Sequence, residues 1–168
     1  MHIYTMRWYL RLLIGKSPRR TLVRTIIIAA VAFVVFRYLL IPIHLMGASM
    51  EPAYADRSVN IVNTFRFRFR TPQRGDVVAI RMAGTRVMLF KRVIGLPDER
   101  IGFREGILIV NGKEFHEPYV VNREKWNMPE VVVGENEYFV AGDNRGTAIE
   151  GHALGRVDKR RIAGGPLF

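Results

Sequence analysis

The fold class of this chain is decided by residues 100–115, Arg-Ile-Gly-Phe-Arg-Glu-Gly-Ile-Leu-Ile-Val-Asn-Gly-Lys-Glu-Phe. Within them, short apolar runs at Arg100–Phe103 and Ile107–Val110 are separated by Glu105-Gly106, a plausible turn. Asn111-Gly112 then precedes a third short run that ends at Phe115. An Asn-Gly pair between such runs is the strongest short-range indication of a β-hairpin, because both residues accept the positive φ of a type I′ turn. The stretch therefore predicts short antiparallel strands.

Similar runs, rich in β-branched and aromatic residues and bounded by Gly, Pro, Asn and Asp, continue on both sides. We expect further strands at Val59–Thr64, Asp76–Met82, Arg86–Ile94, Val131–Val133, Tyr138–Ala141 and Gly155–Val157. No long amphipathic helix is indicated after residue 43. The 168 residues fit one domain, and 49% hydrophobic with 24% charged residues excludes a disordered chain or a multi-span membrane protein. The sequence predicts an all-β body built as an antiparallel β-sheet of short strands.

The segment Phe65-Arg-Phe-Arg-Phe-Arg70 alternates strictly between aromatic and basic residues. On a strand, this alternation would place three Phe on one face and three Arg on the other. Two interpretations stay open. The segment is either a half-buried strand with a solvated basic face, or an interfacial strip with Phe among acyl chains and Arg at lipid phosphates.

An apolar run, Thr25–Phe36, precedes this body and continues past Arg37 to Ile41. Seventeen helical residues span ~25 Å, which is the short end of what crosses a bilayer. Arg37 can extend its stem toward headgroups, and Pro42 is expected to end the helix. A cleavable signal peptide, with Gly47-Ala-Ser49 as its cleavage site, and a buried core helix are the alternatives.

The charge is distributed unevenly, since residues 1–24 carry six cations and no acid out of a net charge of +11. A nucleic-acid-binding protein is expected to concentrate its cations in the folded domain, so we expect no nucleic-acid partner. A basic segment before an apolar run instead follows the positive-inside rule. We therefore expect a basic cytoplasmic tail at residues 1–24, a transmembrane anchor at 25–43 and an extracytoplasmic β domain at 44–168.

Several chemistries are excluded or disfavoured by composition. The chain has no cysteine, so disulfides, thiolate metal sites and a cysteine nucleophile are excluded. Its four histidines include no i, i+4 pair, and its glycines form no phosphate-binding loop. We expect no metal and no cofactor.

Four short blocks follow the apolar run in a fixed order. They are Gly47-Ala-Ser-Met-Glu-Pro52, Arg74-Gly-Asp-Val-Val-Ala-Ile80, Leu89-Phe-Lys-Arg-Val-Ile-Gly-Leu-Pro97 and Gly142-Asp-Asn-Arg145. In this order and spacing the sequence resembles the type I signal peptidase family across nearly its whole length. These are serine peptidases with a Ser/Lys dyad that release exported proteins from their signal peptides. The resemblance implies a signal-peptidase-like β fold with one N-terminal transmembrane helix.

By this resemblance, Ser49 is the nucleophile and Lys91 the general base. A serine hydroxyl needs a base within hydrogen-bond reach, and a lysine can act as one only if burial lowers its pKa. The apolar run Val87–Phe90 just before Lys91 offers such burial. The alternative is that Ser49 is a turn residue and Lys91 a surface cation.

The remaining site residues also follow from the resemblance. Leu45, Met50 and Phe90 are expected to line shallow pockets for Ala-x-Ala-like sequences, although each could equally be a core residue. Gly47 is expected beside the oxyanion site, where backbone N–H groups including that of Ser49 would donate. The supporting motif residues are Pro52, Arg92, Gly142, Asp143, Asn144, Arg145 and Glu150.

The last block departs from the family pattern. By the resemblance, Ala148 occupies the position of a serine that normally orients the lysine. Lys91 is therefore expected either to use the hydroxyl of Thr147, one residue earlier, or to work less well. Glu150 keeps the acidic charge and is expected to pair with Arg92 or with His152, which replaces an arginine. These departures indicate a weaker or more specialised enzyme.

The implied function is a membrane-anchored serine endopeptidase that cleaves signal peptides from preproteins after small residues. Its partners would be preprotein signal peptides and membrane lipid, and association with the export translocon is compatible with this role. The implied location is the bacterial inner membrane, crossed once, with the catalytic domain outside the cytoplasm. Two alternatives remain: a pilin-type maturation peptidase of the same family, and an inactive homologue that binds signal peptides as a membrane interaction module.

Overall fold

The computed structural model describes residues 17–82, 88–152 and 154–167. The chain divides into two compact units, Met1–Leu39 and Leu40–Phe168. The basic residues before position 17 and the start of the strand expected at Arg86–Ile94 lie outside the described residues. Each unit is considered by itself.

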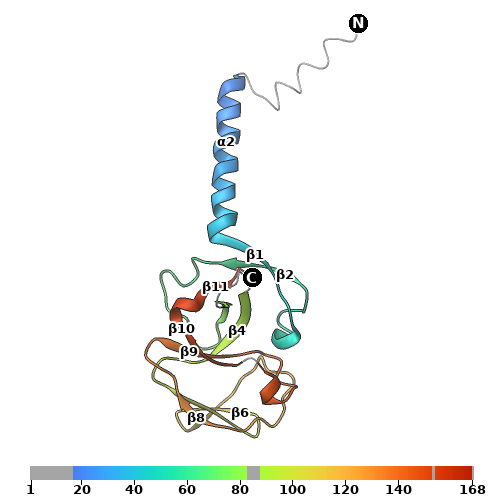
Figure 1. Ribbon diagram of the computed structural model, residues 1–168, viewed down its shortest axis with the longest axis vertical. Coiled ribbons are helices and arrows are strands. Elements are labelled where there is room, and N and C mark those ends of the chain that lie inside the picture. Colours follow the sequence, from blue (N-terminus) through green and yellow to red (C-terminus); the bar gives the residue numbers. More distant parts are fainter. Residues whose placement is uncertain (1–16, 83–87, 153, 168) are drawn as a thin grey trace. The chain divides into compact units, whose positions relative to one another are not determined.

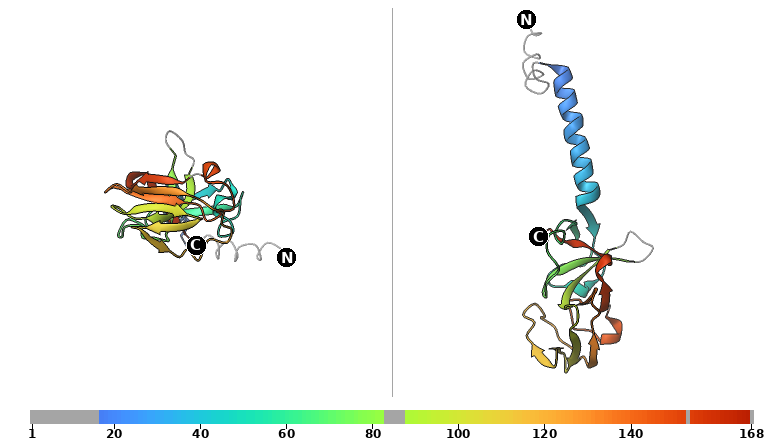
Figure 2. Two further views of the ribbon diagram at one scale, coloured as in Figure 1. Left: turned by 90° about the horizontal axis from the view of Figure 1, so that it is seen from below. Right: turned by 90° about the vertical axis from the view of Figure 1, so that its left-hand side faces the viewer.

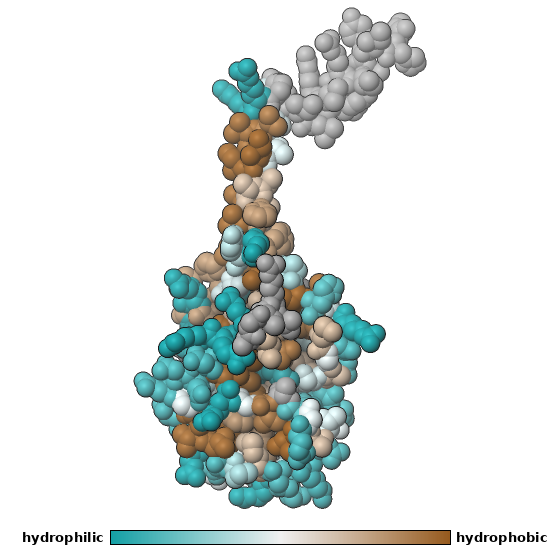
Figure 3. All heavy atoms as spheres, in the orientation of Figure 1, coloured by the Kyte–Doolittle hydropathy of each residue, from teal (hydrophilic) through white to brown (hydrophobic). Residues whose placement is uncertain are grey.

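The first unit contains helix α2 (Pro18–Val34), which continues as a π-helical turn, η1 (Val35–Leu39). Proline at the first helical position is favoured, because its missing N–H would have no partner there. Most large apolar side chains on the helix are exposed, as the space-filling view shows (Figure 3). The segment Arg19–Leu39 is long and apolar enough to cross a membrane.

The helix ends earlier than the sequence predicted. It stops at Leu39, and the next residues form strand β1 (Leu40–His44), whereas the sequence predicted a helix through Ile41 that Pro42 would end. Strand β1 pairs with β2 (Val59–Asn63) in the register Leu40↔Asn63 to His44↔Val59. Pro42 is compatible with this strand because β1 is at the sheet edge, where a missing N–H need not break a ladder.

The second unit is an antiparallel all-β body, which confirms the expected fold class. A seven-stranded sheet has the order β1, β2, β11 (Ile162–Pro166), β3 (Val77–Arg81), β4 (Met88–Gly95), β9 (Glu137–Ala141) and β10 (Gly155–Asp158). A four-stranded sheet has the order β7 (Lys113–Phe115), β6 (Ile107–Val110), β5 (Arg100–Arg104) and β8 (Met128–Val132). Within the body, β1 and β2 lie at one end and β6 and β8 at the other (Figures 1 and 2).

The hairpin predicted around Asn111-Gly112 is present. Strands β6 and β7 pair with Ile109 opposite Glu114, and β5 pairs with β6 with Ile101 opposite Val110. Asn111 and Gly112 have φ values of 50° and 77°, the positive pair that a type I′ connection requires. This local chemistry fixes the smaller sheet.

The half-buried strand considered for the alternating segment 65–70 is wrong, because these residues form turns and not a strand. Arg70 makes two hydrogen bonds to Asp76, of 2.6 and 2.9 Å, and Arg66 donates to the Pro166 carbonyl over 2.8 Å. These contacts curl the backbone. Phe67 packs on the core while Phe69 is 87% exposed, so the three Phe do not share one buried face.

Strand β11 was not predicted, because Ile162-Ala-Gly-Gly-Pro166 has the composition of a loop. Gly164 explains its place in the sheet: a Cβ there would overlap the backbone of Asn63 in β2. The strand exists because two backbones approach closely, and sequence periodicity does not record such an approach.

Three clusters of buried residues form the core. The cluster that matters for function contains Leu45, Met50, Val62, Val77, Ala79 and Phe90. It lies between the larger sheet and a short 3₁₀ helix, η2 (Ala48–Met50). Two other 3₁₀ turns, η3 (Ile149–Gly151) and η4 (Lys159–Arg161), connect strands near the C-terminus.

Candidate active site

The structure brings Ser49 and Lys91 together. Ser49 lies in the middle of η2, and Lys91 lies in β4, 42 residues further along the chain. The Lys91 Nζ donates a hydrogen bond of 2.8 Å to the Ser49 Oγ. This is the nucleophile-to-base distance that activation of a serine requires.

Lys91 is only 4% exposed, although it is a charged residue type. Burial lowers its pKa from 10.5 to about 8, and the nearby Asp143 carboxylate acts in the opposite direction. Burial disfavours the ammonium, so the free amine is accessible near neutral pH. Lys91 therefore has the environment of a general base.

This environment predicts a pH dependence. Below a pH of about 8 the Lys91 amine is increasingly protonated, so kcat/KM should fall about tenfold per pH unit and level off above it. Initial cleavage rates of one peptide between roughly pH 6 and pH 10 would measure this limb. A limb centred near the ordinary lysine value would show that burial does not tune Lys91.

Backbone contacts hold Ser49 in place. The Asn144 N–H donates to the Ser49 carbonyl over 3.1 Å, and the Asn144 side-chain amide donates to the Ala48 carbonyl, also over 3.1 Å. Gly142 lies so close to the Ser49 carbonyl that a Cβ at position 142 would overlap its oxygen. The Gly-Asp-Asn-Arg turn, residues 142–145, therefore forms a cradle for the segment Ala48-Ser49, which carries the candidate nucleophile.

The backbone N–H groups of Gly47 and Ser49, both considered for the oxyanion site, differ in their hydrogen bonds. The Gly47 N–H donates to the Asp56 carboxylate over 2.6 Å, so that amide already has an acceptor. The Ser49 N–H has no acceptor among the residues that the structure describes. Ser49 thus offers the backbone donor beside its own hydroxyl, where the developing oxyanion would form.

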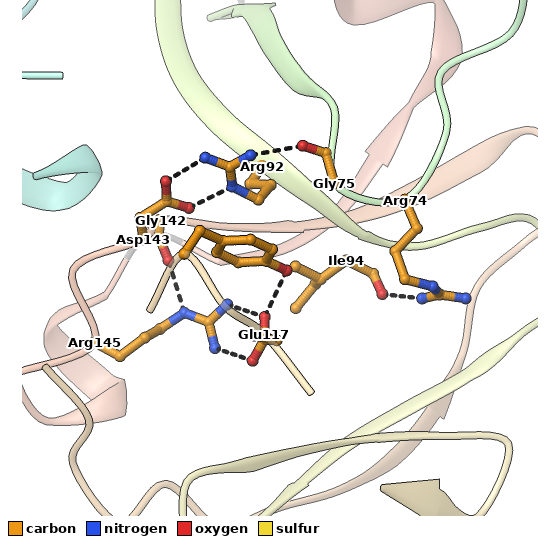
Figure 4. Close-up of polar contacts among 9 residues, drawn as sticks. Arg74, Gly75, Arg92, Ile94, Glu117, Gly142, Asp143 and Arg145 are labelled. Atoms are coloured by element: carbon orange, nitrogen blue, oxygen red, sulfur yellow. Dashed lines mark hydrogen bonds and ion pairs between the residues drawn. The ribbon is translucent and has the colours of Figure 1, made fainter. Parts of the chain in front are cut away.

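Arg92 follows Lys91 and connects three of the sequence blocks (Figure 4). Its Nε donates to Asp143 over 2.7 Å, and its Nη1 donates to the Gly75 carbonyl over 2.6 Å. The expected pairing of Arg92 with Glu150 is wrong, because Asp143 is its partner and Glu150 is exposed on η3. Pro52 follows η2 after one residue, Glu51.

Arg145 has a partner that sequence reasoning missed. Its guanidinium binds both carboxylate oxygens of Glu117, at 3.1 and 2.7 Å, and its Nε donates to the Gly142 carbonyl over 2.7 Å (Figure 4). Both side chains are almost completely buried. Tyr119 adds a hydroxyl that donates to Glu117 over 2.9 Å. No motif marked Glu117, which lies in the irregular segment between β7 and β8.

A small pocket adjoins Ser49. Leu45, Met50 and Phe90 line it, as expected, and they are also members of the core, so both interpretations hold together. Its volume is about 20 Å³. Tyr54 and Met88 also line it but were not predicted. The Tyr54 ring meets Phe90 edge-on, with centroids 5.3 Å apart.

Thr147 and Ala148 are exposed, and the Thr147 carbonyl accepts a hydrogen bond from the Trp126 indole over 2.7 Å. His152 packs against the same indole, with ring centroids 4.7 Å apart. Burial lowers its pKa to about 4, with Lys91 and Arg145 adding to the effect, so the imidazole is neutral. Within the described residues its Nε2 is buried without a partner, and no cluster of acidic or histidine side chains could hold a metal.

Comparisons with known proteins identify the family of this chain. The family described as "Signal peptidase, peptidase S26" matches residues 19–167. Signal peptidase I of Bacillus licheniformis is 33% identical over 165 residues, which cover 87% of this chain and 85% of that protein. Signal peptidase IB of Staphylococcus aureus (strain Mu50) is 28% identical over 172 positions, covering 89% and 90%.

A solved structure is also similar. The crystal structure of a signal peptidase I from Enterococcus faecalis V583 aligns with a TM-score of 0.45 and 28% identity, over 57% of this chain and 97% of that chain. The family match extends from the apolar helix to the last strand and includes Ser49, Lys91 and the Gly-Asp-Asn-Arg block. The chain belongs to the signal peptidase family, peptidase S26.

Proposed function

We propose that this protein is a membrane-anchored serine endopeptidase that removes signal peptides from preproteins with a Ser49/Lys91 dyad. The observation that carries the proposal is the 2.8 Å hydrogen bond between the Lys91 Nζ and the Ser49 Oγ, at a lysine whose pKa is lowered by burial. A structural lysine would gain nothing from losing its charge, whereas a general base requires it.

The mechanism follows from this geometry. The neutral Lys91 amine accepts the hydroxyl proton while the Ser49 Oγ attacks the scissile carbonyl, and the Ser49 N–H donates to the oxyanion. The ammonium then returns its proton to the leaving amine, and an acyl-enzyme remains. Water, deprotonated by the same lysine, hydrolyses the ester and restores Ser49.

The pocket beside Ser49 supports small residues before the cut. A space of about 20 Å³ is enough for one water-sized group, which corresponds to a methyl side chain. The rings of Tyr54 and Phe90 both line it, so a branched side chain would require the lining to move. This favours Ala-x-Ala-like sites.

The proposal is tested by incubating the purified full-length protein in detergent with a preprotein that carries an Ala-x-Ala site. Wild type should release the mature protein with a new N-terminus directly after the site, and Ser49→Ala should release none. Replacing the last alanine of the site by phenylalanine should also prevent cleavage. Binding without cleavage by wild type would instead support the inactive signal-peptide-binding homologue.

The anchor and its orientation are part of the same proposal. Helix α2 is exposed and apolar, and the six cations of residues 1–24 favour a cytoplasmic N-terminus under the positive-inside rule. Membrane lipid is then a partner, the bacterial inner membrane the location, and the chain crosses it once. Association with the export translocon stays an expectation.

Protease accessibility measures this topology. Protease added outside cells with a permeabilised outer layer should digest the β body, residues 44–168. A cytoplasmic marker protein in the same cells should stay intact. Protection of the body under these conditions would reverse the proposed orientation.

The departures in the last block give one reason to consider a narrower function. Ala148 offers no hydroxyl, and the exposed Thr147 forms no side-chain hydrogen bond in the part of the chain that the structure describes. Lys91 then has Ser49 as its hydrogen-bond partner there, which suits a slower enzyme that serves one substrate. Cleavage of a single cognate preprotein, with no cleavage of general preproteins, would favour such a maturation peptidase.

A further inference from the structure

Glu117 is a buried acid with no place in the mechanism above. It lies in the irregular segment between β7 and β8, and its side chain has no exposed surface. A buried carboxylate loses its hydration, so such a group is expected only where specific partners replace the water. Its partners are the Arg145 guanidinium and the Tyr119 hydroxyl.

The Arg145 guanidinium connects Glu117 to the cradle of the nucleophile. It is a rigid plane, with both Nη atoms on Glu117 and its Nε on the Gly142 carbonyl (Figure 4). Because all three nitrogens belong to one plane, the position of the carboxylate sets the direction of the Nε donor. The Phe103 and Trp126 rings lie 5.3 and 5.2 Å from the guanidinium carbon and limit its other orientations.

The cradle then acts on Ser49. The turn 142–145 contacts the nucleophile segment through two hydrogen bonds from Asn144, to the Ser49 and Ala48 carbonyls, and through the close approach of Gly142. The Glu124 N–H also donates to the Arg145 carbonyl over 2.8 Å, so the same segment holds both the backbone and the side chain of Arg145.

We propose that Glu117 is a positioning residue for catalysis: through Arg145 it fixes the 142–145 turn against Ser49 and so keeps the Ser49 Oγ within reach of Lys91. The inference rests on the proposed function, since it requires that Ser49 and Lys91 perform the reaction. Stability alone would not demand this pair, because buried ion pairs can often be replaced by apolar residues without loss. An oriented carboxylate, in contrast, has no apolar substitute.

The first test is Glu117→Gln, which keeps the side-chain volume but places an amide N–H group against the guanidinium. We expect kcat per folded molecule to fall on the order of 10- to 100-fold with KM little changed, since a displacement near 1 Å can cost about 100-fold. The pH limb of Lys91 should not move, because Glu117 is not among the groups that shift the pKa of Lys91. A moved limb would reveal an electrostatic role and overturn positioning.

The control is Glu99→Gln, which removes the carboxylate from a different ion pair, the partly buried one with Arg74. Arg74 contacts the Ile94 carbonyl and not the nucleophile segment. This variant should lose stability but keep kcat per folded molecule. Equal losses of kcat in Glu99→Gln and Glu117→Gln would indicate a general structural effect and contradict the inference.

A double variant separates folding from positioning in case Glu117→Gln is too unstable. Glu117→Leu combined with Arg145→Met replaces the buried ions by apolar side chains and should recover the melting temperature. The rate should stay low, because no Nε holds the Gly142 carbonyl. Recovery of the rate together with stability would overturn the inference. If wild type itself failed to cleave, the proposed function would fail instead, so the two failures are distinguishable.

Discussion

Lys91→Arg should lower kcat at least about 1000-fold, nearly as far as Lys91→Ala, which is the range expected when a general base is removed. The guanidinium keeps its proton in proteins, so it preserves the charge but cannot accept the Ser49 hydroxyl proton. The prediction separates two roles for the residue at the end of the 2.8 Å hydrogen bond. A base must be neutral, whereas an electrostatic or structural cation must be charged.

The measurement is single-turnover cleavage of one signal-peptide substrate, with folding checked by circular dichroism. Lys113→Arg is the control, because Lys113 is an exposed lysine on β7 and should tolerate the change. Substantial activity in Lys91→Arg would show that Lys91 acts by its charge. The dyad mechanism would then be wrong for this protein.

Much of the β body could be predicted because its information is local. The Asn111-Gly112 turn specifies its own backbone angles, and the runs on either side alternate or stay apolar over the length of a strand. The four blocks also pointed to Ser49 and Lys91, and in the fold the Lys91 Nζ lies 2.8 Å from the Ser49 Oγ. The roles of these two residues followed from the family resemblance that the blocks carry.

The missed elements depend on contacts between distant segments. The alternation of residues 65–70 is typical of a strand, but Arg66 and Arg70 bind the Pro166 carbonyl and Asp76, and the segment turns. Strand β1 likewise forms because it pairs with β2. The apolar run that continues from the helix into β1 does not reveal that pairing. Tertiary partners override a local pattern in both cases.

The sequence identified the candidate reactive residues of the site but not the residues that hold them in place. Glu117, Tyr119 and Trp126 lie in a segment with no motif, and only folding brings them to Arg145. The expected partner of Arg92 was an acid of the last block, and it is Asp143 and not Glu150. A sequence names reactive residue types, whereas the groups that orient them are defined by long-range packing.

Gly142→Ala is expected to reduce kcat about 100-fold with the fold retained, since the added methyl group must displace the Ser49 carbonyl and with it the nucleophile by about 1 Å. Gly142 does not have a positive φ, so alanine meets no backbone strain there. The tightest overlap is with the Ser49 carbonyl oxygen, and the His152 Nε2 would lie 3.0 Å from the new Cβ. Gly151→Ala is the control, because a Cβ there meets nothing within 4 Å. Both variants should bind substrate normally, and their kcat values from steady-state kinetics should differ. Unchanged kcat in Gly142→Ala would mean that the turn can retreat without moving Ser49, and the cradle would then not position the nucleophile.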